Sequence, residues 1–270
     1  MLVSGRSRLK ASTVLETKPT MLAKGTLLEP SVTPRSRKSG AKSRATRAYE
    51  QIRDEILRGN FAMGDILSRR RLAEKLNMSF VPITEALQRL ESEGLVESRP
   101  RIGTRVRIPT KQDILDSYII REALETQAAR LCCEQMTASE KDQLLRAAKH
   151  LDKLFVASTA ESEDSGFLFS VHTYHMQFHM RIAEYGRSTR LLRAIEKEQV
   201  LVFNWLYDSA AQQRHLPTNF HHDLAKALCS GNIADTDNAM RSHIRYGLNH
   251  ILENLGPLET SNGWRLKHRK

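Results

Sequence analysis

Several features are scarce in this 270-residue sequence, and each scarcity excludes some classes of protein. Only three cysteines occur (Cys132, Cys133 and Cys229), and none is spaced as CxxC. We therefore expect neither a disulfide framework nor a thiolate zinc site. We also expect a reducing, cytoplasmic location. Apolar runs stay well short of the roughly 18 residues of a membrane span, and we see no signal-peptide pattern. HExxH, serine or cysteine nucleophile motifs and a phosphate-binding glycine loop are missing, which argues against an enzyme.

Acidic residues are scarce in the N-terminal segment. Residues 1–48 hold 11 Lys/Arg against Glu16 and Glu29, so +9 of the net charge of +11 lies there. Because residues 1–46 are also rich in Ser, Thr, Gly and Pro, we expect a disordered basic tail. The tail could be a solvated extension without function, an arm that contacts DNA phosphates, or an organelle transit peptide. A second, short tail is expected at 257–270.

Residues 47–109 carry the pattern of three helices followed by a two-stranded ribbon. Apolar residues recur at helical spacing over 49–56, 72–76 and 83–90. Ser79 is a good N-cap for the third helix, with Pro82 in its first turn. The segments 95–99 and 104–108 then read as strands, and the second alternates apolar residues with arginines. This order predicts a winged helix-turn-helix.

The same region resembles the N-terminal domain of GntR-family bacterial transcription regulators. The likeness runs over YEQIRDEILRGNFAMGDILSRRRLAEKLNMSFVPITEALQRLESEGLVESRPRIGTRVRI. In that family the segment equivalent to 79–85 usually reads Ser-Arg-Thr-Pro-Val-Arg-Glu, and its two arginines reach DNA. Here Phe80 and Thr84 stand in their places, whereas Arg70 and the wing glycine, Gly103, match. The resemblance implies a DNA-binding domain in which direct reading of guanine is weakened.

A less G-dependent operator is therefore expected. Phe80 and the methyl group of Thr84 could contact thymine methyls, with phosphate contacts restoring affinity. Alternatively, Phe80 only packs against a neighbouring helix and specificity is lost. The expected DNA-binding residues are Arg69, Arg70, Arg71, Ser79, Phe80, Thr84, Arg101 and Gly103.

Residues 110–256 are expected to form an all-helical bundle. Leu115, Ile119, Ala123 and Leu124 give one amphipathic stripe, and the capping box of Thr137 and Glu140 opens a further helix. This part resembles the FCD ligand-binding domain of the FadR-like branch of the family, through FHMRIAEYGRSTRL and HHDLAKALCSGNIADTDNAMRSHI. The predicted fold class is thus mostly α, a winged helix-turn-helix followed by an FCD-type bundle.

Histidines of this bundle are the candidate metal ligands. His175 and His179 are spaced i, i+4 on one helix, and two imidazoles from other helices could complete a metal site. On spacing alone, these histidines could equally be ordinary buried or exposed side chains. The resemblance implies the set His175, His179, His221 and His243, with His175 where the family usually has Asp. An all-nitrogen set favours Zn²⁺, Ni²⁺ or Cu²⁺ over Mn²⁺ or Mg²⁺, with Zn or Ni expected. If His175 lies outside the set, His172 or His222 could replace it.

Arg121 is the candidate effector-binding residue. It lies in IIREALE, which resembles the family's Arg-x-x-Leu-Glu helix, and a guanidinium suits a carboxylate. It could instead form a structural ion pair with Glu125. The resemblance implies a homodimeric regulator, expected to repress a metabolic operon, that binds double-stranded DNA and a small carboxylate effector but no membrane. The alternatives are a metal-dependent enzyme and a basic, weakly sequence-specific DNA-associated protein.

Overall fold

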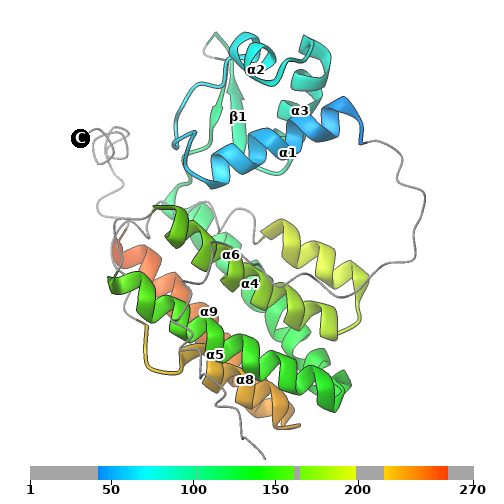
Figure 1. The fold of residues 1–270 in the computed structure, drawn as a ribbon, viewed down its shortest axis with the longest axis vertical. Helices are drawn as coiled ribbons and strands as arrows, with labels where there is room; N and C mark the ends of the chain where they lie inside the picture. The colour runs from blue at the N-terminus through cyan, green and yellow to red at the C-terminus, as the bar shows by residue number, and fades with distance from the viewer. Residues whose placement is uncertain (1–41, 102, 161–164, 199–215, 255–270) are drawn as a thin grey trace, which may run out of the picture. The chain divides into compact units, whose positions relative to one another are not determined.

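The computed structural model describes residues 42–101, 103–160, 165–198 and 216–254 (Figure 1). The expected basic tail, apart from its last few residues, and the expected tail at 257–270 lie outside the described residues. No helix within the described ranges has the length and apolarity needed to cross a bilayer. The predicted fold class is confirmed, because a winged helix-turn-helix is followed by a helical domain.

The first part has the predicted order of three helices and a ribbon. Its elements are α1 (Arg44–Leu57), α2 (Arg69–Leu76), α3 (Phe80–Ser92), β1 (Val96–Arg99) and β2 (Gly103–Val106). The antiparallel strands pair Val96 with Val106 and Arg99 with Gly103. Helices α1 and α2 both pack on α3, and Ile52, Ile83 and Leu90 are among the fully buried core residues. The apolar positions used for the prediction are therefore the core of this domain.

Caps and turns fix the ends of these helices. Ser43 caps α1, so the helix begins at Arg44 rather than at the expected boundary at residue 47. Ser68 caps α2, and Asn77 ends it in the left-handed conformation at φ 50°. This sharp turn between α2 and α3 lets two short helices pack closely, which sets the direction in which the N-terminus of α3 projects.

The second part is a bundle of long helices. Its named elements are α4 (Lys111–Gln135), α5 (Ala138–Ala160), α6 (Ser165–Tyr185), α8 (Phe220–Cys229) and α9 (Ile233–Asn254), and residues 189–198 are also helical. Helix α4 packs against α6, α8 and α9, while α5 packs against α6 and α8. Thr110 and Asp113 form a capping box at the start of α4, and Thr137 and Glu140 form the predicted one before α5.

The amphipathic stripe expected on α4 is only partly buried, through Leu115 and Leu124. Ile119 is 67% exposed and Ala123 is also exposed, whereas Arg121 and Glu125 are 6% and 3% exposed. The buried face of α4 thus carries an ion pair among apolar residues such as Ile114. Hydrophobic periodicity fails here because charged residues are placed inside the bundle, where they require partners.

Candidate functional site

Four buried histidines from three helices meet in the helical domain. Helix α6 supplies His175 and His179 one turn apart, α8 supplies His221 in its first turn, and α9 supplies His243. His179 Nε2 lies 3.0 Å from His175 Nε2 and 3.1 Å from His243 Nε2. His175, His221 and His243 each place a ring nitrogen within 4.8 Å of the others. All four residues of the expected set are therefore brought together.

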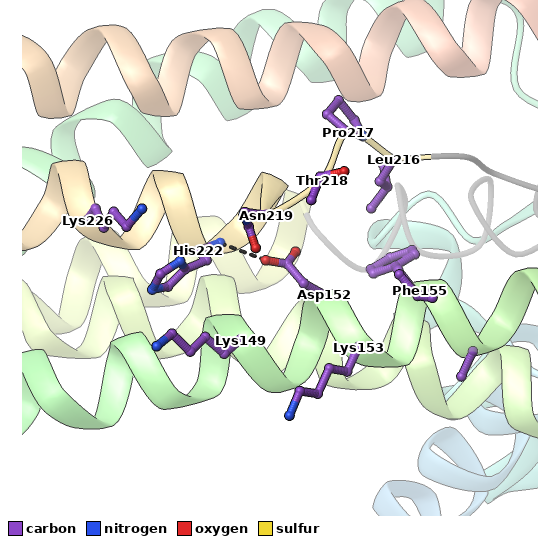
Figure 2. Close-up of a pocket in the computed structure, with 12 residues that line it drawn as sticks. Lys149, Asp152, Lys153, Phe155, Leu216, Pro217, Thr218, Asn219, His222 and Lys226 are labelled. Atoms are coloured by element: carbon purple, nitrogen blue, oxygen red, sulfur yellow. Dashed lines mark hydrogen bonds between the residues drawn. The ribbon is translucent and has the colours of Figure 1, made fainter.

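Among the described residues, the set of ring nitrogens that lie within 4.8 Å of one another includes neither possible replacement for His175. His172 is buried and packs edge-on against Phe155, with ring centroids 6.0 Å apart. His222 lies on the outer side of α8, beside Lys149 and Lys226 in Figure 2. The replacement of the family's Asp by His175 therefore leaves position 175 inside the cluster.

Two carboxylates orient two of the imidazoles, and neither was named among the site residues from sequence. Glu125 Oε2 lies 2.6 Å from His179 Nδ1, and Asp152 Oδ1 lies 2.7 Å from His221 Nδ1. A carboxylate at Nδ1 favours a proton on that nitrogen, which leaves the lone pair on Nε2. For both His179 and His221, Nε2 is therefore the nitrogen available as a metal ligand.

Arg121 belongs to the same chain of contacts. Its Nε donates to Glu125 Oε1 at 2.7 Å, so the order is Arg121, Glu125, His179. Burial raises the pKa of Glu125, but the charge of Arg121 and the hydrogen bonds from His179 and Arg121 outweigh it and lower that pKa to about 2. Burial likewise lowers the pKa of Arg121, and the neighbouring Glu125 raises it by more. The ion pair considered as an alternative from sequence is thus present, and it leads to the histidines.

Asp152 reaches His221 from a distant part of the chain. Its Oδ1 also accepts the backbone N–H of His221 at 2.9 Å, and its Oδ2 accepts that of His222 at 3.0 Å. The carboxylate therefore caps α8 while it holds the imidazole. Its pKa is raised by burial but lowered by more through the hydrogen bonds from His221 and His222.

The donor set fits a transition-metal ion. Two nitrogens bound to one ion at about 2.1 Å lie roughly 3.0 to 3.4 Å apart for bond angles of about 90° to 109°. The distances of 3.0 and 3.1 Å from His179 Nε2 to its two neighbours agree with this spacing. Buried imidazoles backed by carboxylates are the surroundings typical of histidine metal ligands. The residues present can therefore hold a divalent ion that prefers nitrogen.

The start of α3 is the second candidate site. Phe80 is 57% exposed and Val81 is 66% exposed, whereas Pro82 and Ile83 are buried. The structure therefore does not show Phe80 packed away against a neighbouring helix. The Thr84 hydroxyl donates to the Phe80 carbonyl at 2.9 Å, so this hydroxyl is already satisfied within the helix. This end of α3 presents apolar groups to solvent.

Basic side chains surround these apolar groups. Arg69, Arg70 and Arg71 are all exposed, and Arg70 pairs with Glu74 at 3.1 Å. An exposed pair of this kind is worth little, so a phosphate could replace Glu74. Arg44, which sequence reasoning placed in the tail, lines a hollow of about 440 Å³ together with Arg70 and Phe80. Only its position in the first turn of α1, directly after the Ser43 cap, could have indicated from sequence that Arg44 belongs to the folded domain.

The remaining expected DNA-binding residues lie at helix and wing ends. Ser79 occupies the N-cap position of α3, but its side chain makes no capping hydrogen bond. Arg101 lies in the turn of the ribbon at φ 66°, and Gly103, the first residue of β2, follows it at φ 93°. Arg101 is exposed, and, apart from Gly103 and its two chain neighbours, no described residue has an atom within 4 Å of where a Cβ on Gly103 would be. This turn is therefore an open, basic wing tip.

Comparisons with known proteins agree with both halves. The sequence model described as "Bacterial regulatory proteins, gntR family" matches residues 44–106, and that of the FCD domain matches residues 116–246. The chain belongs to the GntR family. It is a DNA-binding transcription regulator with an FCD domain, and such regulators are not enzymes.

Individual relatives match over much of their length. The chain is 28% identical over 213 residues to the "Probable D-xylose utilization operon transcriptional repressor" of Paenarthrobacter nicotinovorans, covering 74% of this chain and 86% of that one. It is 25% identical to the "Uncharacterized HTH-type transcriptional regulator YdhC" of Bacillus subtilis (strain 168), over 57% of this chain and 66% of that one. The structure of E. coli McbR/YncC shares the fold, with a TM-score of 0.64 over 79% of this chain, 99% of that chain, and 19% identity.

Proposed function

We propose that this GntR-family regulator is a homodimeric, cytoplasmic repressor of a metabolic operon, controlled by a small carboxylate effector and a bound metal ion. The observation that carries the proposal is the buried cluster of four imidazoles in the helical domain of a DNA-binding regulator. Repression and control of a metabolic operon are supported by the name of the Paenarthrobacter relative. A dimer suits an operator of two half-sites, which one winged helix from each subunit would read.

The metal would be held by His175, His179, His221 and His243. An all-nitrogen set favours Zn²⁺ or Ni²⁺, and the bound ion would supply a Lewis-acidic position for an effector carboxylate. Glu125 and Asp152 keep Nε2 of His179 and His221 free of protons, so both rings are ready to bind. Effector binding would change the spacing of the two DNA-binding domains.

Arg121 is proposed as a further effector contact, although Glu125 already occupies its Nε. An effector carboxylate would meet the rest of the guanidinium, since this group has five N–H donors. Arg121→Lys retains a positive charge but loses the planar fork. We expect it to weaken binding of a carboxylate effector while metal content, measured by mass spectrometry, stays unchanged.

The operator is proposed to be less dependent on guanine than operators read by two arginines. Phe80 and Val81 present apolar surface that suits the thymine methyl group. The exposed side chains of Arg69, Arg70, Arg71 and Arg101 would contact phosphates, which supply affinity without sequence information. Ser79, whose hydroxyl makes no cap bond, can donate to a phosphate or a base edge.

Selection of genomic DNA fragments on the purified full-length protein at near-physiological salt tests this function. An enriched pseudo-palindrome rich in T·A pairs is expected, and the neighbouring genes would indicate the effector. Absence of enrichment, together with equal affinity for any duplex and a steep salt dependence, would instead support a weakly sequence-specific DNA-associated protein. Light scattering of the eluting protein tests the homodimer.

A further inference from the structure

A hollow of about 800 Å³ lies on the outer side of the helical domain, between α5 and the start of α8. Figure 2 shows that its two ends differ in chemistry. Lys149, Lys226 and His222 lie at one end, Phe155 and Leu216 lie at the other, and Lys153 lies between them. This volume is in the range of pockets that hold small organic molecules, and its lining would suit a molecule with one polar and one apolar end.

The charge of the hollow is positive. Asp152 is the only acidic side chain among the described residues that line it, and its oxygens already accept hydrogen bonds from His221 and His222. Lys226 pairs with Asp223 at 3.0 Å, but both side chains are more than half exposed, so the pair is weak. Lys149 has no ion pair with any described residue. The cationic end is therefore available to an anion.

Residues of the hollow and of the histidine cluster both contact His221. Nδ1 of this imidazole faces Asp152, which lines the hollow, while Nε2 is left for the cluster. Phe155, which also lines the hollow, stacks on the His221 ring with centroids 5.2 Å apart and planes at 18°. Asp152 and Phe155, which both line the hollow, therefore contact His221 of the histidine cluster.

We propose that this hollow is a second ligand site, which binds a small organic phosphate with an apolar body, and that its occupancy is transmitted to His221 through Asp152 and Phe155. Lysines bind phosphate as point charges, and no arginine among the described lining residues offers the fork that suits a carboxylate. The apolar end accommodates the body of the molecule. The site is distinct from the effector position proposed at the metal, so this inference goes beyond the proposed function.

Calorimetric titration of the full-length, metal-free protein with phenyl phosphate tests the site. Inorganic phosphate and benzyl alcohol serve as comparison probes for the two ends. We expect phenyl phosphate to bind more tightly than either. Lys149→Glu/Lys226→Glu should weaken its binding about tenfold or more, because two like charges would then face the phosphate. The matched control, Arg130→Glu/Arg146→Glu, makes the same charge change at exposed positions of α4 and α5 and should bind as the native chain does.

The transmission is read separately by nitrogen NMR of the His221 imidazole, assigned with His221→Gln. Phenyl phosphate should shift the His221 signals in the native chain and in the control but not in the lysine variant. Equal binding by native and lysine-variant proteins, or no binding by the native protein, would overturn the site. Binding without a shift at His221 would overturn the transmission. None of these readouts depends on metal or DNA, so their failure is distinct from failure of the proposed repressor function.

Discussion

The Asp152 carboxylate accepts two hydrogen bonds from His221, one from the imidazole Nδ1 at 2.7 Å and one from the backbone N–H at 2.9 Å. The first fixes the tautomer of a candidate metal ligand, and the second caps the helix on which that ligand lies. Asp152→Asn keeps the shape of the side chain but removes its charge. We expect metal affinity, measured by competition with a chelator, to fall about 10- to 100-fold.

Asp142 provides the control for that variant. It lies exposed on the same helix and away from the cluster, so Asp142→Asn should leave metal affinity unchanged. Equal affinities for the two variants would contradict the orienting role of Asp152.

The ion pair of Arg121 and Glu125 makes a prediction about stability. Arg121 Nε lies 2.7 Å from Glu125 Oε1, and both side chains are almost inaccessible to solvent. Arg121→Met therefore leaves the buried Glu125 carboxylate without its cationic partner. Loss of one partner of a buried pair costs about 3–5 kcal/mol, measured as the free energy of unfolding in urea. Arg130→Met, at an exposed position of the same helix, should cost less than about 0.5 kcal/mol. A similar small cost for both would show that Glu125 is stabilised by other groups.

Phe80→Arg restores one of the arginines usual in the family. Because Phe80 is exposed at the start of α3, the new guanidinium should reach a base edge and add a preference for guanine worth about 1–3 kcal/mol at one position of each half-site. Fragment selection with the variant measures this preference. Gln127→Arg, an added charge on α4, is the control for nonspecific attraction. An unchanged operator preference in Phe80→Arg would refute reading by this residue.

Deletion of residues 1–41 separates two interpretations of the basic tail. The logarithm of the DNA-binding constant falls linearly with the logarithm of the salt concentration, and each phosphate contact adds about 0.9 to the steepness of this line. If the tail is an arm that neutralises phosphates, its removal should therefore flatten the line. Fluorescence anisotropy between about 50 and 200 mM salt measures the slope. An unchanged slope would favour a solvated extension without a role in DNA binding.

Removal of metal separates a structural from a sensing role. Chelation should lower the melting temperature of the protein, since an ion that binds only the folded state stabilises it. If the metal also contacts the effector, effector affinity falls as well, and a purely structural ion would change only the melting temperature. The variant His243→Ala should show the same behaviour without chelator.

Sequence patterns predicted the winged helix-turn-helix because its helices bury apolar residues at regular spacing, such as Ile83 and Leu90. They also predicted the pairing of His175 with His179, since residues four apart share a helix face. The carboxylate at His221 could not be predicted in this way, because Asp152 is distant in sequence and meets His221 only through the packing of α5 against α8. Likewise, the stripe around Ile119 misled because the interior of the bundle is partly ionic.

The cap that Asp152 makes on α8 has a consequence for local unfolding. If the first turn of α8 opens, the backbone bonds of His221 and His222 and the side-chain bond of His221 break together, because one carboxylate accepts all three. Opening of this turn and loss of the imidazole's orientation are then a single equilibrium. Slow exchange of the two amide protons with deuterium would therefore report directly how long His221 stays ready to bind.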